Sequence, residues 1–482
     1  MTTTGTSTGA LGGLLDGPPA VVAAGVDVFS GALRAQGVSV ADVDWRPPGL
    51  GDAADLTALA LDPRRAAANR TAVERVLAAG SVLVDVRPAR EVLGMEGRTL
   101  LHSGPPLNWE AASGPMRGAL VGACLFEGWA STVEEAEALL ASGGVELEPC
   151  HHRSAVGPMA GVTSPSMWAW CLEDPVNGGR AYCNLNEGLG KVLRMGAFNQ
   201  EVLTRLAWMR DVLGPLLARA VRSMAEPLDV KAVLAQMLQM GDEGHNRNRA
   251  GSLMTLRELS PALAALDAPS DDVAAALRFI GGNEHFFLNL GMPTAKLAMD
   301  AARDVPGSTL VTVMARNGTE FGVQTAGTGD RWFTGPAQTP VGLFLGDYGP
   351  EDANPDIGDS AIMETYGVGG FSMAAAPAIV RFVGGTVPDA LATTERMYQL
   401  TLAENPAMAI PILGFRGAPT GIDVLAVART GWLPQINTGM AGRVAGTGQV
   451  GAGLVQPPRE CFEGALAALA QEARAAARVV VR

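Results

Sequence analysis

The run MGDEGHNRNR holds the densest group of side chains in this sequence that could carry out chemistry. On helical spacing, Asp242 and His245 share one face, and Glu243 and Arg247 share another. So many polar groups between apolar helical stretches would be costly to bury unless they were used. We predict that Glu243 and His245 transfer protons, and that Asp242, Asn246 and Arg247 bind substrate. A solvated connector between two helices is the competing interpretation.

A divalent metal ion is an alternative use of Asp242, Glu243 and His245, if the fold brought further ligands to it. Their spacing matches no known metal-binding signature, so we predict no metal and no other cofactor. If a metal were bound, hydrolysis of an amide or a lactam ring would become the expected activity.

Two adjacent histidines, His151 and His152, are followed by Arg153 in a segment rich in proline and glycine. Adjacent side chains of an extended chain point in opposite directions, so at most one histidine usually faces a given ligand. We predict that His152 transfers a proton, and that His151 and Arg153 bind substrate, because a guanidinium group can hold an anion. The alternative is a surface turn with a solvated pair.

Two asparagines stand two residues apart in CNLNEGLGK. On an extended chain, Asn184 and Asn186 lie on one face, where a pair of amides could hold a planar carbamoyl or carboxamide group. Glu187 follows directly and is a further candidate catalytic residue. The alternative is an asparagine-rich turn that caps the next helix.

Weaker candidates for substrate binding come later in the chain. Asn283 and His285 share one face of an extended chain in GGNEHFF, although His285 could equally be a buried core histidine. A glycine-rich entry to a helix can cradle an anion, but the spacing in ETYGVGG is not that of a P-loop. The remaining predicted substrate-binding residues are Asn317, Glu364, Gly369, Gly370 and Asn437.

The composition is that of a large globular protein that binds small molecules. Hydrophobic residues make up 48% and charged residues 18% of the 482 residues, which is enough for two or three packed domains. The net charge of −13 argues against a nucleic-acid surface, and no stretch is apolar enough to span a membrane. The five cysteines show no CxxC spacing, and the N-terminus lacks a signal peptide's positive region. We expect a cytoplasmic homo-oligomer that binds neither nucleic acid nor membrane.

The hydrophobic pattern predicts an α/β protein with a small N-terminal parallel α/β domain, a central helical subdomain and a C-terminal mixed α/β domain. Residues 1–17 are expected to form a flexible tail. A strand, a helix that ends at Gly37 and a second apolar run then give a strand–helix–strand unit, and another helix begins at Asp62. With a buried strand at Ser81–Val86, residues 18–103 are predicted to form a Rossmann-like α/β domain.

Residues 104–197 carry many of the motifs and are expected to form a further α/β segment. Apolar residues at i, i+3 and i+4 spacing predict that residues 198–280 are the helical subdomain, interrupted at Pro215. Residues 281–482 are predicted to be mixed α/β. The expected elements there are a hairpin, a strand and a closing helix, at Asn317-Gly318, Ile422–Val427 and Glu460–Ala477.

Four of these runs resemble the YlbE/YahG family, namely PCHHRSAVGPMAGVTSPSM, RAYCNLNEGLGKVLRMGA, MGDEGHNRNRAGS and GGNEHFFLNLGMP. The resemblance extends from about Val21 to Val455. In addition, GVDVFSGALRAQGVSVADVDWRPP resembles a unit that this family shares with FdrA-type, acyl-CoA-synthetase-like proteins. The family includes the AllG subunit of oxamate carbamoyltransferase from anaerobic allantoin breakdown, an enzyme that also contains FdrA-type and AllH subunits.

The resemblance implies a carbamoyltransferase, or a subunit of one, in purine and nitrogen catabolism. Its substrates would be carbamoyl phosphate and a small ureido or oxamate-like compound, and FdrA-type and AllH-type subunits would be its partners. A non-catalytic assembly subunit is the alternative. The Ser-Thr-Arg-Thr and His-Pro-x-Gln motifs of aspartate and ornithine transcarbamylases are absent from the sequence. Carbamoyl phosphate would therefore have to bind in a different way.

Overall fold

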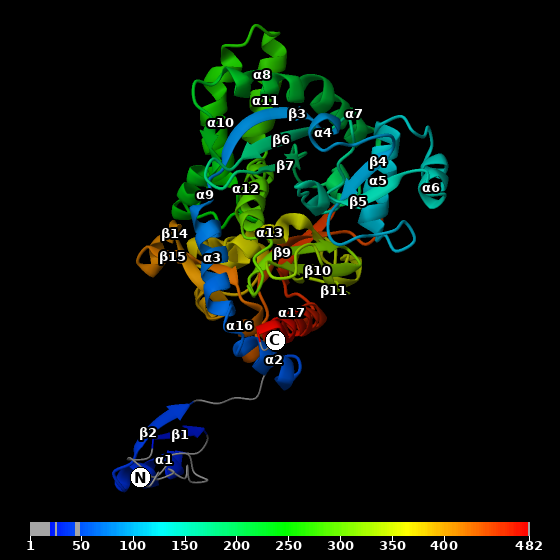
Figure 1. Ribbon diagram of the computed structural model, residues 1–482. Helices are drawn as coiled ribbons and strands as arrows, with labels where there is room; N and C mark the ends of the chain where they lie inside the picture. The colour runs from blue at the N-terminus through cyan, green and yellow to red at the C-terminus, as the bar shows by residue number, and fades with distance from the viewer. Residues whose placement is uncertain (1–19, 25–26, 44–48, 481–482) are drawn as a thin grey trace. The chain divides into compact units, whose positions relative to one another are not determined.

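Figure 1 shows the computed structural model of the chain, which describes residues 20–24, 27–43 and 49–480. The chain divides into two compact units, residues 1–48 and residues 49–482. The flexible tail predicted at residues 1–17 lies outside the described residues.

The first unit contains the strand–helix–strand arrangement that the sequence predicts. Strands β1 (Ala20–Ala24) and β2 (Ser39–Val43) are parallel, and helix α1 (Asp27–Ala35) connects them. A parallel pair requires such a crossover, because its strands cannot be joined by a tight turn.

The second unit contains two sheets whose strands come from distant parts of the chain. The strand predicted at Ser81–Val86 forms, but it pairs antiparallel with later strands and is not part of a parallel N-terminal sheet. The order of this sheet is β7-β6-β3-β8, with bounds Arg180–Asn184, Trp168–Glu173, Val82–Pro88 and Leu228–Asp229. The other sheet is a parallel pair of strands, β4 (Thr99–His102) and β5 (Glu146–Pro149). The helices in this part of the chain are α4 (Ala89–Val92), α5 (Gly114–Phe126) and α6 (Val133–Ala141).

The predicted helical region is present, and a π-helical turn at Met209–Leu213 interrupts it immediately before Pro215. Its helices are α7 (Gln200–Trp208), α8 (Gly214–Ser223), α9 (Val230–Gln239), α10 (Arg249–Ala264) and α11 (Ser270–Gly282). A further helix, α12 (Leu288–Ala301), follows beyond the predicted boundary at residue 280. Every residue of α12 from Leu288 to Met299 is buried, because it packs against strands β6 and β7 and helices α9, α3 (Arg65–Ala78) and α13 (Ile362–Tyr366). No helix among the described residues is long and apolar enough to cross a membrane.

The C-terminal part is mixed α/β, as predicted. Asn317-Gly318 forms the turn of an antiparallel hairpin in the sheet β11-β10-β9-β13, and a second sheet has the order β12-β17-β16. These strands are β9 (Val311–Asn317), β10 (Glu320–Thr325), β11 (Phe333–Pro336), β12 (Val341–Phe344), β13 (Ile357–Gly358), β16 (Ile436–Ala441) and β17 (Gln449–Val455).

The remaining elements pack around these sheets. They are the hairpin of β14 (Thr401–Ile410) and β15 (Arg416–Ile422), and helices α2 (Ala53–Ala60), α3 (Arg65–Ala78), α13 (Ile362–Tyr366), α14 (Val380–Val383), α15 (Val387–Met397), α16 (Val424–Thr430) and α17 (Arg459–Val480).

Two local predictions about helix and strand ends need correction, and one is confirmed. The strand predicted at Ile422–Val427 is wrong, because the Asp423 side chain accepts the Leu425 N–H and starts helix α16 there. The helix predicted from Asp62 begins at Arg65, because the Asp62 carboxylate binds Arg64 instead. The closing helix at the C-terminus is present as α17.

A buried ion pair joins Asp356, the residue before the edge strand β13, to the hairpin. Arg316 Nε and Asp356 Oδ2 are 2.6 Å apart, and both side chains are fully buried. The same guanidinium group donates to the Gly358 carbonyl oxygen at 2.7 Å and to Thr438 Oγ1 at 3.0 Å. Three segments of the C-terminal part therefore meet on one buried cation.

Replacing Asp356 with alanine should lower the free energy of unfolding by about 3–5 kcal/mol, because the Arg316 guanidinium would stay buried without its counter-charge. Arg474→Ala is the matched control, since it breaks a partly exposed pair with Asp55 and should cost less than about 1 kcal/mol. Chemical denaturation followed by circular dichroism measures both changes. Equal, small losses in the two variants would contradict this assignment.

Candidate functional site

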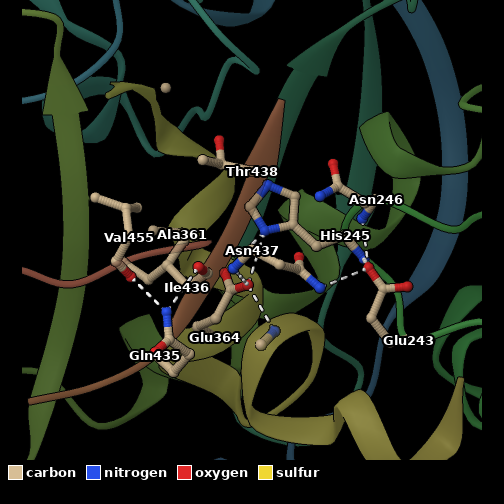
Figure 2. Close-up of polar contacts among 12 residues, drawn as sticks. Glu243, His245, Asn246, Ala361, Glu364, Gln435, Ile436, Asn437, Thr438 and Val455 are labelled. Atoms are coloured by element: carbon tan, nitrogen blue, oxygen red, sulfur yellow. Dashed lines mark hydrogen bonds and ion pairs between the residues drawn. The ribbon is translucent and has the colours of Figure 1, made fainter. Parts of the chain in front are cut away.

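Glu243 lies in the loop between α9 and α10 and is completely buried. Its carboxylate accepts backbone N–H hydrogen bonds from His245 at 3.1 Å and Arg247 at 3.0 Å, and a third from Asn246. Asn437 Nδ2, on β16, donates to the same carboxylate at 3.2 Å (Figure 2). The loop thus wraps its own N–H groups around a buried carboxylate, as backbone nests do around anions.

His245 forms a second buried pair, with Glu364 of α13. Its Nδ1 atom lies 2.8 Å from Glu364 Oε1, which also accepts the backbone N–H of Gly370 at 2.8 Å and of Asn437 at 3.3 Å. A Cβ atom on Gly369 would lie 2.3 Å from this oxygen, so glycine is required for the approach. Because Glu364 holds Nδ1, the other ring nitrogen is available to exchange a proton with a ligand. Figure 2 shows that nitrogen turned away from Glu364.

We call Glu243, His245, Glu364 and Asn437 the polar centre. Burial raises the pKa of the Glu243 carboxyl group to about 7, although His245 and the backbone donors lower it. A carboxyl group with such a pKa can give or accept a proton near neutral pH. The polar centre therefore contains two groups that can move protons, Glu243 and His245, and a carboxylate that orients the imidazole.

A cavity of about 660 Å³ lies beside the polar centre, lined by the loop before α10, the turn before α12, helix α14 and strands β12 and β17. Three of the residues that line it also carry a buried side-chain atom that has no hydrogen-bond partner among the described residues, namely Asn246 Nδ2, Asn248 Oδ1 and His285 Nδ1. Asn437 Oδ1 in the polar centre is in the same condition. Burial lowers the pKa of His285 to about 3, so its ring is neutral. Since buried polar atoms are nearly always hydrogen-bonded, these four leave hydrogen-bonding capacity unused around the polar centre.

The paired asparagines do share a face, as their spacing predicts, but they bind another asparagine. Asn186 Nδ2 donates to Asn289 Oδ1 at 2.6 Å, and Asn289 Nδ2 donates to the Asn184 carbonyl oxygen at 2.7 Å. Asn283 Nδ2 donates to the Asn186 carbonyl oxygen at 3.1 Å, and its Oδ1 accepts the His285 N–H at the same distance. This network ties β7 to α12 and positions His285 at the cavity.

The two acidic residues Glu187 and Asp242 hold backbone segments in place. Glu187 accepts the N–H groups of Leu193 at 2.7 Å and of Arg194 at 3.1 Å, and burial raises its pKa. Asp242 accepts the Ala250 N–H at the start of α10, and burial raises its pKa as well. Both carboxylates therefore bind backbone N–H groups of the protein itself.

The segment His151–Arg153 lies among other partners. His151 Nε2 is 3.4 Å from Asp359 Oδ1, and Trp332 packs edge-on at 5.9 Å between ring centroids. Trp332 Nε1 donates to His152 Nε2 at 3.1 Å, and Arg153 forms an ion pair with a glutamate of β5. None of these partners belongs to the polar centre or lines its cavity.

Asn317 takes part in the hairpin turn, where its Oδ1 accepts the N–H groups of Thr319 and Glu320 at 3.0 and 2.7 Å. The structure thus joins some predicted site residues and separates others. Those at the polar centre, beside it or on its cavity are Glu243, His245, Asn246, Arg247, His285, Glu364, Gly369, Gly370 and Asn437.

Sequence reasoning did not select Asn248, Asn289 or Arg381. Asn248 lies in the run MGDEGHNRNRAGS and Asn289 in the run GGNEHFFLNLGMP, so the polar character of these runs could have suggested them. Arg381, which lines the cavity, stands alone in an apolar stretch and carries no such local indication. In the described part of the chain, no three His, Cys, Asp or Glu side chains are grouped as metal ligands would be. The arrangement of Asp242, Glu243 and His245 therefore lends no support to the metal alternative.

Known proteins resemble this chain over most of its length. A family model described as "Oxamate carbamoyltransferase subunit AllG" matches residues 145–360. The chain is 45% identical to "Uncharacterized protein YahG" of Escherichia coli, over 94% of this chain and 97% of YahG. It is 49% identical to "Oxamate carbamoyltransferase subunit AllG" of the same organism, over 84% of this chain and 98% of AllG.

A solved structure has the same fold. It is the crystal structure of a conserved protein of unknown function from Enterococcus faecalis, with a TM-score of 0.84 and 47% sequence identity. The match covers 85% of this chain and 98% of that protein.

The raised pKa of Glu243 predicts a pH dependence of stability. The folded chain keeps a proton that the unfolded chain releases between pH 4.5 and about 7. Folding stability from this group is therefore fully present below pH 4.5, and about 3 kcal/mol is lost as the pH rises through 7.

Denaturation of the wild type and of Glu243→Gln between pH 4.5 and 7.5 measures this effect. The amide does not titrate, so the variant should gain stability relative to the wild type as the pH rises. Parallel pH profiles for the two proteins would show that Glu243 titrates normally.

Proposed function

The chain belongs to the family of YahG and AllG, and we propose that it is the catalytic chain of a carbamoyltransferase of the oxamate carbamoyltransferase type. The donor would be carbamoyl phosphate, and the acceptor a small oxamate-like compound. One observation carries this proposal, which is the set of buried, unpartnered amide and imidazole atoms beside Glu243 and His245.

A carbamoyl group matches the chemistry of these atoms. Its carbonyl oxygen accepts hydrogen bonds and its NH₂ group donates two, so it needs both kinds of partner. Asn246 Nδ2 can donate to the oxygen, while Asn248 Oδ1 and Asn437 Oδ1 can accept from the nitrogen. Binding the group would satisfy atoms that are costly to leave buried alone.

The proton-moving groups of the polar centre suit the transfer step. In that step the acceptor's amide nitrogen forms a bond to the carbamoyl carbon, the bond from this carbon to the phosphate oxygen breaks, and phosphate leaves. The nitrogen also loses a proton, which His245 can take while Glu364, 2.8 Å from its Nδ1, stabilises the resulting imidazolium. Glu243, whose pKa burial raises to about 7, is the second group able to accept or return that proton.

Partner subunits belong to the proposal as well. The relative AllG is named as a subunit, so we expect this chain to work with FdrA-type and AllH-type subunits, in the cytoplasm and in allantoin and purine catabolism. A homo-oligomer of this chain within that assembly is also expected.

The activity can be tested with ¹³C-labelled carbamoyl phosphate and oxamate, with the purified chain alone and together with FdrA-type and AllH-type partners. We expect a labelled ureido acid and free phosphate, detected by NMR. Glu243→Gln and His245→Gln should each slow product formation by about 100-fold or more, because each removes a proton-moving group. Glu74→Gln, on the exposed face of α3, is the matched control and should keep the wild-type rate.

Two other results would lead to other functions. If the assembled complex is active and both centre variants keep the wild-type rate, the chain is an assembly subunit and the catalytic residues lie on a partner. If the chain releases ammonia or opens a lactam ring without carbamoyl transfer, and a chelator abolishes this activity, it is a metal-dependent hydrolase.

A further inference from the structure

We propose that Arg381, together with Arg247 in the lining of the same cavity, forms an anion subsite next to the polar centre. The subsite would bind the carboxylate of the acceptor or the phosphate of the donor, while the carbamoyl group reaches the buried amides. The inference rests on the proposed function and adds to it the residues that select an anionic substrate.

The charge of the cavity wall is the first reason. Three arginines line the cavity, Arg247, Arg249 and Arg381, and Glu284 is the one carboxylate among the lining residues. The neutral His285 adds no charge. The lining thus carries more positive than negative charge on a chain whose net charge is −13, and this local excess favours an anion.

The three arginines differ in what they already bind. Arg249 lies 3.4 Å from Glu284. The Arg247 Nε atom donates to the Gly241 carbonyl oxygen at 3.2 Å and lies 3.8 Å from Asp242 Oδ1. Arg381 is an exposed residue of α14 that forms no ion pair and no side-chain hydrogen bond with any residue that the structure describes. Its planar fork of donors is therefore available for a carboxylate or a phosphate, which it can hold through two hydrogen bonds.

The second reason is independent of charge. Asn248 is 1% exposed, lines the same cavity, and has an Oδ1 atom without a partner in the described chain. The Phe382 ring lies 5.8 Å from the Arg247 guanidinium carbon, and both side chains line the cavity. The residues that line the cavity thus include a buried asparagine with an unpartnered oxygen as well as arginines, which fits a small ligand with a neutral amide end and an anionic end.

Binding measurements on the full chain test the subsite, with oxamate and inorganic phosphate as separate probes in isothermal titration calorimetry. We expect Arg381→Ala to weaken binding of at least one probe by about 10- to 100-fold, because charge-assisted hydrogen bonds are lost. Arg381→Lys should bind with intermediate affinity, since it keeps the charge but not the fork. Arg429→Ala, on an exposed part of α16, is the matched control and should bind as the wild type does.

The probe that loses affinity identifies whether the carboxylate or the phosphate occupies the subsite. Unchanged binding of both probes by Arg381→Ala, or no binding of either by the wild type, would overturn the inference. Loss of binding in a chain that shows no carbamoyl transfer would support the anion subsite and reject the proposed function. Carbamoyl transfer by the wild type, with unaltered anion binding in Arg381→Ala, would support the proposed function and reject the anion subsite.

Discussion

Two buried carboxylates, those of Glu243 and Glu364, must be supplied with hydrogen-bond donors, and the arrangement around the site follows from this requirement. An unpaired carboxylate in a protein interior is too costly to keep. The donors come from the loop before α10, from the segment after α13, and from strand β16. The helical region and the C-terminal sheets are consequently held together at the point where the proton-moving groups lie.

The buried asparagines have different roles in this structure, and the role of each depends on its hydrogen-bond partners. Asn184, Asn186 and Asn289 bind one another and join a strand to the buried helix α12. Asn248 and Asn437 each retain a side-chain oxygen without a partner among the described residues. The first set stabilises the framework around the cavity, and the second remains available to a ligand.

Glycine and arginine complete the site in ways that depend on space and charge. Gly369 permits Glu364 to approach His245, since a Cβ atom at this position would collide with the carboxylate oxygen. The anion cradle predicted from this glycine-rich segment therefore holds the protein's own anion, because the Gly370 N–H points to Glu364. A position for an external anion is provided by the cavity arginines instead, on a chain that is acidic as a whole.

The sequence by itself determined features that depend on neighbouring residues, and the tertiary structure decided those that depend on distant ones. The hairpin at Asn317-Gly318, the helical region and the position of the run MGDEGHNRNR between two helices could be predicted, because turn chemistry and hydrophobic period are local. The antiparallel partners of β3, the pairing of His245 with Glu364, and the separation of His151–Arg153 from the polar centre could not be predicted in this way. His245 and Glu364 lie 119 residues apart in the chain, and Asn186 and Asn289 lie 103 apart. Such long-range contacts decide whether a polar side-chain atom is hydrogen-bonded within the protein or left without a partner. A local pattern of residues does not contain this information.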